Sequence, residues 1–256
     1  MPRANRFHIP GYIWHITHRC HKKEFLLKFN RDRRRWLYWL FKAKKRFGLN
    51  ILNYTVTSNH IHLLVVDGKD EWAIPRSMQL VEGRMGQEYN QRKNRRGAFW
   101  EDRYHATAVQ PGFHLARCMA YIDLNMVRAG VVRHPVEWKF GGYQLIQNPP
   151  QRYMLVNRSL AAKLLNLNNP GELAQAQRDW VNRVLDSGKN YYQPEWTESI
   201  AVGDYDFVKK TMEELGIAAQ YREIVEDDGI ATLKEPDISY RPIFDPKIEG
   251  LSQYRG

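Results

Sequence analysis

Two histidines, His60 and His62, stand one residue apart at the start of the apolar run HIHLLVV. In a β-strand, side chains two residues apart point to the same face, and their Cα atoms are about 6.6 Å apart. Both imidazoles could therefore bind one metal ion, since neutral imidazole is a common metal ligand. A pair of this kind is more often an ordinary polar pair on a sheet face, so the hypothesis of a metal site requires further ligands.

A second set of polar residues follows one edge of the predicted helix PGFHLARCMAYIDLNMVRAG, residues 111–130. The set recurs at intervals of four, four and three residues, which aligns side chains along a helix, and consists of Arg117, Tyr121, Asn125 and Arg128. On this helix alone, a solvated polar edge is the simpler interpretation. A second, apolar stripe is expected to face the core, and it consists of Phe113, Ala116, Ala120, Leu124 and Val127.

The histidines and the helix edge together predict a chemistry. A tyrosine hydroxyl has a pKa of about 10 and is a weak nucleophile at neutral pH, so it needs an electrophile that is already activated. A metal ion on His60, His62 and the Asn125 carbonyl would polarise a phosphate oxygen. Tyr121, one helical turn before Asn125, would lie beside that phosphate. The arginines would bind the phosphate groups.

Basic and aromatic residues alternate in the segment QRKNRRGAFWEDRYHA, residues 91–106. Such a mixture is typical of surfaces that bind single strands by phosphate contact and base stacking, although a solvated loop followed by a core strand would look similar. The DNA-binding candidates of this segment are Arg92, Lys93, Arg95, Arg96, Trp100, Arg103, Tyr104 and His105, and the helix adds Arg117 and Arg128. A zinc site on His15, His18, Cys20 and His21 is disfavoured, because residues 15 and 18 of a strand face opposite ways.

The elements that must position these residues follow from periodicity and turn signals. Residues 1–150 predict an α+β domain with a mainly antiparallel sheet and helices on its face. Strands are expected at 12–20, 50–57, 60–66 and 99–109, with a tight hairpin at Ser58 and Asn59, and helices at 31–47, 74–92 and 111–130. Residues 151–256 predict a mostly helical region, with helices at 169–186 and 203–216 and an irregular tail from Glu235.

Charge divides the chain at the same place. Residues 1–150 carry 26 Lys and Arg against 11 Asp and Glu, a net charge of +15, and residues 151–256 carry 13 against 17, a net charge of −4. A basic half of this kind favours a polyanionic partner. The two cysteines exclude a disulfide scaffold, and the lack of a long apolar run predicts no membrane partner and a cytoplasmic protein.

The order of these motifs resembles the HUH single-tyrosine transposases, in particular the group related to REP-associated tyrosine transposases. The resemblance covers roughly residues 6–145 and rests on the segments YIWHITHRC, SNHIHLLV, SMQLVEGRMGQEYNQRKNRRGAFWEDRYHA, MAYIDLNMVRAGVV and VEWKFGGYQ. It implies the ferredoxin-like HUH endonuclease fold, with His60 and His62 as the metal pair, Tyr121 as the nucleophile and Asn125 as the third ligand. It further implies Mg²⁺ or Mn²⁺ as cofactor, single-stranded DNA beside hairpins as substrate, a 5′-phosphotyrosine intermediate, and a nucleoid-associated monomer or homodimer.

Two positions depart from the pattern of those relatives. Met126 stands where a proline usually follows the asparagine, and Gly141-Gly142 stands where two serines are usual. The glycines are expected to affect DNA contacts more than chemistry. Two alternatives stay open at this point: a replication initiator or relaxase that shares the two-histidine site, and a hairpin-binding regulatory protein without nuclease activity.

Overall fold

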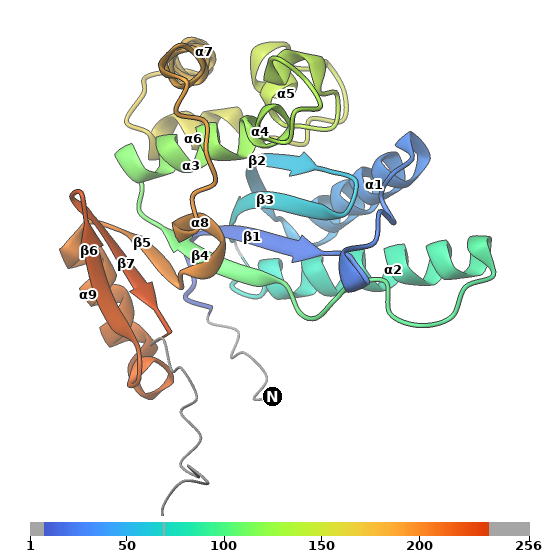
Figure 1. Cartoon of the computed structure of the whole chain (residues 1–256), viewed down its shortest axis with the longest axis horizontal. Coiled ribbons are helices and arrows are strands. Elements are labelled where there is room, and N and C mark those ends of the chain that lie inside the picture. Colours follow the sequence, from blue (N-terminus) through green and yellow to red (C-terminus); the bar gives the residue numbers. More distant parts are fainter. Residues whose placement is uncertain (1–7, 69, 236–256) are drawn as a thin grey trace, which may run out of the picture.

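One mixed sheet of seven strands organises the protein, in the order β2-β3-β1-β4-β5-β7-β6 (Figure 1). The computed structural model describes residues 8–68 and 70–235. The strands are β1 (Ile13–Arg19), β2 (Asn50–Val56), β3 (His60–Val66), β4 (His105–Val109), β5 (Ala201–Gly203), β6 (Glu223–Asp227) and β7 (Ile230–Lys234). The α+β class with a mainly antiparallel sheet is confirmed, because only the β4–β5 pair is parallel among these strands.

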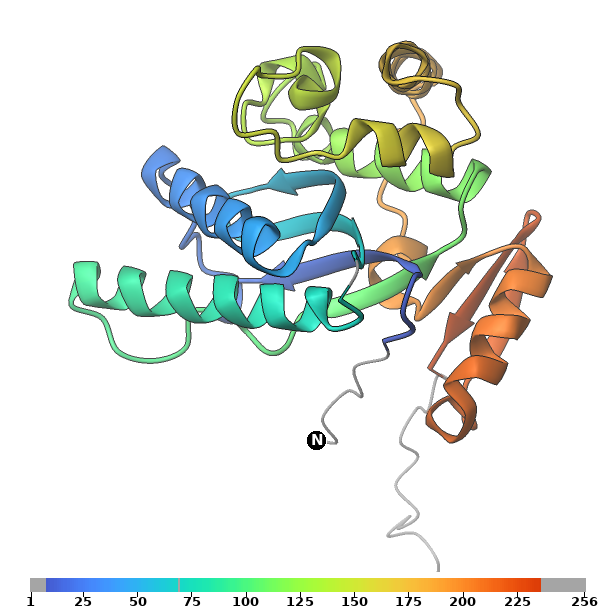
Figure 2. The same ribbon diagram turned by 180° about the vertical axis from the view of Figure 1, so that it is seen from behind.

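Helices cover both faces of the sheet. They are α1 (Asn30–Phe47), α2 (Ala73–Lys93), α3 (Phe113–Asp123), α4 (Asn125–Arg128), α5 (Tyr143–Gln147), α6 (Arg158–Leu164), α7 (Pro170–Ser187), α8 (Glu195–Glu198) and α9 (Tyr205–Leu215), with 3₁₀ turns η1 (His21–Lys23), η2 (Pro135–Glu137) and η3 (Gly216–Ala219). Helices α1 and α2 pack together on one face, and α3 lies on the other with α6 and α7 beyond it (Figures 1 and 2). None of the helices in the described part of the chain is long and apolar enough to cross a membrane.

The β2–β3 hairpin that carries the two histidines forms where the turn residues predict it. The Thr57 amide donates to the His60 carbonyl over 3.0 Å and closes the turn at Ser58 and Asn59. Helix α1 holds this turn from outside, because the Arg33 guanidinium donates to the Thr57 carbonyl and to Ser58 Oγ. The start of β3 is therefore fixed before any side chain of the site is considered.

The predicted helix over 111–130 is wrong in two respects. It is interrupted at Leu124, so α3 ends at Asp123 and the short α4 begins at Asn125. The expected apolar stripe does not face the sheet as a whole, since Phe113 is 69 % exposed and the fully buried residues are Leu115, Cys118, Met119 and Ile122. Ala120 and Leu124 are buried, but Leu124 packs with Tyr143 of α5 and with Val181 of α7. Two apolar faces on one helix explain the error, because periodicity cannot tell which layer each face meets.

The C-terminal region is mostly helical, and it also contributes three strands that the sequence did not predict. Strand β5 adds to β4 in parallel, and β7 and β6 follow as an antiparallel pair at the edge of the sheet (Figure 1). The sheet thus includes strands from both sides of residue 150, while a domain boundary at that residue stays a proposal. The irregular tail predicted from Glu235 lies outside the described residues beyond that position.

Candidate metal and nucleophile site

His60 and His62 lie on the same face of β3, at the hairpin end of the strand. Their ring centroids are 5.1 Å apart with the planes nearly perpendicular, and Ile61 between them is fully buried. The side-chain amide of Asn125 approaches His62 Nε2 to 2.9 Å, although 63 residues separate the two in sequence. The structure therefore brings the third predicted ligand to the histidine pair.

His15 orients His62 from the neighbouring strand β1. His15 Nδ1 lies 2.8 Å from the Trp196 carbonyl, which can only accept a hydrogen bond, so Nδ1 carries the proton. His15 Nε2 is then an acceptor, and it receives the His62 Nδ1–H over 2.9 Å. As a result His62 Nε2 carries no proton, and its lone pair accepts a hydrogen bond from Asn125 Nδ2 over 2.9 Å.

His60 is oriented by the hairpin turn. Its Nδ1 lies 2.8 Å from Asn59 Oδ1, a carbonyl-type acceptor, and 3.0 Å from the Thr57 hydroxyl. Donation from Nδ1 to Asn59 leaves Nε2 of His60 without a proton as well. Neither Asn59 nor His15 was assigned a role from the sequence, because each acts through a histidine that only the fold brings near.

Burial keeps these imidazoles neutral. It lowers the pKa of His15 to about 3 and that of His60 to about 4. The pKa of His62 is well below its usual value for the same reason, and the adjacent His60, His15 and Arg128 lower it further. The neutral imidazole is the form that binds metal, so at neutral pH the site needs no deprotonation to accept an ion.

Tyr121 lies beside the histidines on α3. Its ring centroid is 5.8 Å from that of His62 in an edge-to-face arrangement, and the ring is buried. The Arg128 guanidinium lies over the ring at 4.1 Å and donates to the Tyr121 carbonyl over 3.1 Å. Burial raises the pKa of the Tyr121 hydroxyl to about 12, so the hydroxyl is protonated at neutral pH.

A buried carboxyl fixes the end of α3 between Tyr121 and Asn125. Asp123 accepts hydrogen bonds from Asn53 Nδ2 of β2 over 3.0 Å and from Gln177 Nε2 of α7 over 2.7 Å. Asn53 also donates to the Met119 carbonyl of α3. Burial raises the pKa of Asp123 to about 7. Asp123 and Asn53 thereby attach α3 to the sheet and to α7 at the turn between Tyr121 and Asn125.

The three candidate ligands and Tyr121 line one cavity of about 550 Å³. Its wall includes His60, His62, Tyr121, Asn125 and Arg128, together with Arg103 and His105 of the predicted basic segment. Arg19 also lines it, and within the described residues the exposed Arg19 guanidinium makes no hydrogen bond or ion pair. Arg19 was missed from the sequence, although its place in the register, directly opposite His60, marks it as a candidate phosphate ligand.

The remaining predicted DNA-binding residues lie elsewhere or are already paired. Arg92 pairs with Asp32 between α1 and α2, and Arg95 lies 3.6 Å from Glu24. Arg117 lies 3.8 Å from Glu195. Lys93 and Arg96 are exposed near the end of α2. The rings of the two aromatic candidates, Trp100 and Tyr104, are less accessible than expected.

Those two rings pack within the protein. Trp100 stacks on His18 with ring centroids 4.3 Å apart, and Tyr104 is only 8 % exposed. The burial of Tyr104 argues against direct stacking on a base. It follows from a strand that starts at His105 instead of 99, which leaves residues 99–104 folded against β1 and α2.

The alternative zinc site on β1 is not formed. His15 faces His62, whereas His18 lies 3.0 Å from Glu82 Oε1 and 2.7 Å from the Asp102 carbonyl on the other side of the strand. Cys20 is buried and free. Within residues 8–68 and 70–235, no three His, Cys, Asp or Glu side chains cluster as a metal site. The candidate site at His60 and His62 has the Asn125 amide as its third group.

Gly142, one of the two glycines that depart from the expected serines, has a packing role. A Cβ at Gly142 would come within 2.2 Å of Asn53 Oδ1 and 3.1 Å of the Tyr54 amide nitrogen. The Gly142 amide itself donates to the Tyr54 carbonyl over 2.8 Å. Glycine is therefore required there by the close approach to β2.

Comparison with known proteins finds a family that is similar to part of this chain. Residues 9–125 match the family described as "Transposase IS200 like", and the match contains β1, both histidines, Tyr121 and, as its last residue, Asn125. A solved structure of a REP-associated tyrosine transposase bound to a REP hairpin is also similar, with 18 % sequence identity, a TM-score of 0.47, and coverage of 56 % of this chain and 84 % of that one. No curated protein matches the chain.

Proposed function

We propose that this protein is an IS200-like transposase, a metal-dependent endonuclease and strand transferase of single-stranded DNA, with Tyr121 as the nucleophile. The observation that carries the proposal is the convergence on one cavity of two neutral imidazoles, the Asn125 amide, a tyrosine and the Arg128 guanidinium. Binding alone would not require uncharged ligands beside a phenol. A basic cavity without them would hold DNA equally well.

The residues fit a divalent ion. The Nε2 atoms of His60 and His62 are free to ligate because Asn59 and His15 occupy the opposite ring nitrogens. The Asn125 amide is close enough to His62 to contact the same ion through its oxygen once the amide rotates. When bound, Mg²⁺ or Mn²⁺ would polarise a phosphate oxygen and orient the phosphodiester. Both ions are named because the sequence resemblance implies them.

The protein's own groups then carry out a balanced exchange. The Tyr121 oxygen forms a bond to phosphorus and loses its proton to solvent. The bond from phosphorus to the 3′ oxygen breaks, and this oxygen takes up a proton from solvent and leaves as a 3′ hydroxyl. The product is a 5′-phosphotyrosine ester. One phosphate ester replaces another, so a new 3′ hydroxyl can reverse the step without ATP. Arg128 and Arg19 would bind the phosphate oxygens. Their positive charge would offset the negative charge of the phosphate, which favours attack by the Tyr121 oxygen.

The test is covalent capture. A labelled oligonucleotide with a hairpin and a single-stranded flank, the substrate suggested by the sequence resemblance, is incubated with Mn²⁺ and run on a denaturing gel. The protein should form a labelled covalent species, and Tyr121→Phe should abolish it while hairpin binding changes by less than about threefold. Tyr192→Phe serves as the matched control, because it removes a hydroxyl from another tyrosine of the same cavity.

Capture that persists in Tyr121→Phe would assign the nucleophile to another residue. Hairpin binding without capture in any divalent ion would support a regulatory protein that binds DNA without cutting it. Failure of the protein to bind single-stranded or hairpin DNA would contradict the proposal as a whole.

A further inference from the structure

The loop between β1 and α1, residues 21–29, presents aromatic rings to solvent. Phe25 is 65 % exposed and Phe29 is 58 % exposed, whereas the adjacent Leu26 and Leu27 are buried and anchor the loop. Exposed lysines alternate with the rings at Lys22, Lys23 and Lys28. Exposed apolar patches that are rimmed by polar residues mark interaction sites.

The loop is attached to the hairpin turn that orients the metal ligand His60. The Cys20 amide donates to the Asn59 carbonyl over 2.7 Å, and the Leu27 amide donates to the Ser58 carbonyl over 2.9 Å. Asn59 uses both ends of its side chain, since Nδ2 donates to the Lys23 carbonyl over 3.2 Å while Oδ1 accepts from His60. A single asparagine therefore joins the exposed loop to the catalytic strand.

The backbone of the loop is held in one conformation. Lys22 and Lys23 have φ values of 51° and 59°, the left-handed region that side chains other than glycine rarely adopt. Such strain persists only where the surroundings enforce it, and it occurs preferentially at ligand-binding segments. Here the His21 amide donates to the Phe99 carbonyl, and the Lys23 and Glu24 amides close the turn η1.

The end of α2 extends the same surface. Lys93 places its ammonium 5.6 Å from the Phe29 ring centroid, and Arg95 lies 3.6 Å from Glu24. Among the described residues, Lys22, Lys23 and Lys28 make no side-chain hydrogen bond or ion pair, so their charges are available. The one carboxylate of the loop, Glu24, is neutralised by Arg95.

We propose that residues 21–29 are a stacking platform for the single strand that leads to the cleavage site. Phe25 and Phe29 would each take the face of an unpaired base, and the lysines would bind the intervening phosphates. Paired bases of a hairpin stem present no free face, so the platform is specific for the flank. This inference rests on the proposed function, and it assigns the part of the DNA that the loop binds.

The experiment measures the contribution of the flank separately from that of the hairpin. Binding is measured in the Tyr121→Phe background, so that no DNA is cut, with a hairpin that carries a single-stranded flank and with the same hairpin trimmed of it. The flank contains 2-aminopurine, whose fluorescence falls when it stacks. Phe25→Ala with Phe29→Ala should weaken binding of the flanked hairpin about tenfold or more and remove the fluorescence change. Binding of the trimmed hairpin should stay the same.

Two controls sharpen the result. Tyr221→Ala removes another strongly exposed ring, 70 % exposed, from the C-terminal region and should have no effect. Phe25→Trp with Phe29→Trp should restore flank binding, whereas Leu at both positions, which keeps the apolar bulk without a π face, should not. The leucine variant also keeps the test valid if the alanine variant folds poorly.

The outcomes separate the two proposals. Equal binding of the flanked hairpin by the unsubstituted and alanine proteins, or an unchanged fluorescence signal, would overturn the platform and leave the proposed cleavage activity standing. Rescue by leucine would show an apolar contact, as with a protein partner, and would also overturn it. A protein that binds neither DNA would contradict the proposed function and the platform together.

Discussion

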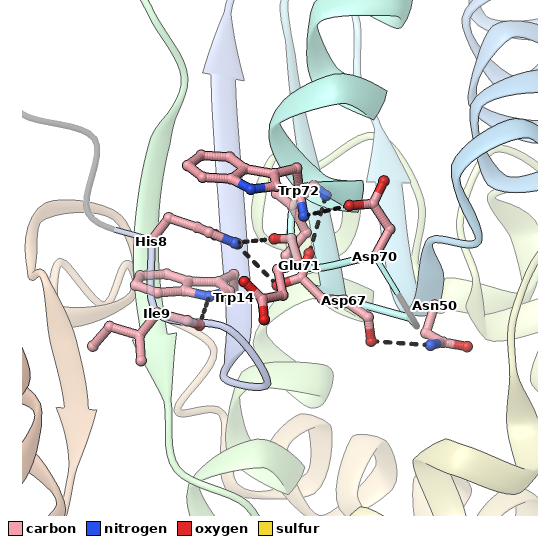
Figure 3. Close-up of polar contacts among 9 residues, drawn as sticks. His8, Ile9, Trp14, Asn50, Asp67, Asp70, Glu71 and Trp72 are labelled. Carbon is pink, nitrogen blue, oxygen red and sulfur yellow. Dashed lines mark hydrogen bonds and ion pairs between the residues drawn. The ribbon is translucent and has the colours of Figure 1, made fainter.

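Histidines lie at both ends of strand β3, and their surroundings shift the imidazole pKa values in opposite directions. At the hairpin end, His62 bonds to His15, and His15 and His60 bond to the neutral oxygens of Trp196 and Asn59; burial lowers the pKa of all three imidazoles. At the other end, His8 lies 3.2 Å from the Asp67 carboxylate and 2.5 Å from the Glu71 carbonyl (Figure 3). Burial lowers the pKa of His8 as well, but those two partners outweigh it and raise the pKa above 6.5.

The difference lies in one carboxylate. Asp67 directly follows β3, accepts from the Ile74 amide at the start of α2, and binds His8 between Trp14 and Trp72 (Figure 3). No described Asp or Glu side chain makes a hydrogen bond or ion pair with His15, His60 or His62. Charged imidazole stabilises a structural contact, whereas neutral imidazole is ready to ligate. The histidines at the two ends of β3 should therefore respond differently to substitution, metal and pH.

The largest effect is expected at the hairpin end. His62→Ala or His60→Ala should abolish DNA cleavage, because each removes a ligand, while the melting temperature should fall only slightly, because an open site contributes little to folding compared with a closed structural one. EDTA should stop cleavage of the unsubstituted protein without unfolding it, and Mn²⁺ or Mg²⁺ should restore it. Gel-based cleavage and thermal denaturation check both statements. Full cleavage in EDTA, or wholesale unfolding of the variants, would mean that the pair serves the fold.

An intermediate effect is expected at His15, which acts through His62. His15→Leu removes both hydrogen bonds and should raise the Mn²⁺ concentration needed for half-maximal cleavage about 10- to 100-fold. His15→Gln can still donate to the Trp196 carbonyl and accept from His62, so it should retain most of the affinity. Direct titration of Mn²⁺ binding distinguishes a positioning role from a general loss of structure. Equal affinities in the two variants would contradict the orientation assigned to His62.

A smaller effect is expected at Arg19, across the strand from His60. Arg19→Gln should weaken binding of single-stranded DNA a few-fold and reduce the salt dependence by about one counterion. The measurement is the dissociation constant at several salt concentrations, with Arg152→Gln, an exposed arginine of the C-terminal region, as the matched control. An unchanged salt slope would remove Arg19 from the DNA contacts.

The smallest effect is expected at the His8 end. Because the folded state raises the pKa of His8 above its unfolded value, the contact stabilises the protein below about pH 6.5 and is lost as pH rises through the folded pKa. His8→Gln should therefore lower the melting temperature by about 2 °C at pH 6 and by nothing at pH 9. Cleavage at pH 8 should be unchanged. A deficit that is equal at both pH values would show that the charge is irrelevant.

The sequence predicted the strands β1 to β3 and the helices α1 and α2 well, since period and turn residues are local signals. It missed His15 as an orienting residue, because strand register and ring rotamers arise only from packing. It missed β5 to β7 as well, since a three-residue strand such as Ala201–Gly203 is too short to show a period. It also placed Tyr104 in the open, because the aromatic run looked continuous with β4. The metal, the nucleophile and the DNA contacts remain proposals.

The acceptor for His15 is the Trp196 carbonyl, 181 residues later in the chain. Strands β1 and β3 are complete early in synthesis, yet the last hydrogen bond that fixes His62 can form only after residue 196 has been made and α8 has packed beside β4. Translation therefore builds a delay into the protein. A ribosome that terminates after Asn125 releases a chain with the proposed nucleophile and all three proposed ligands, but without the contact that orients His62.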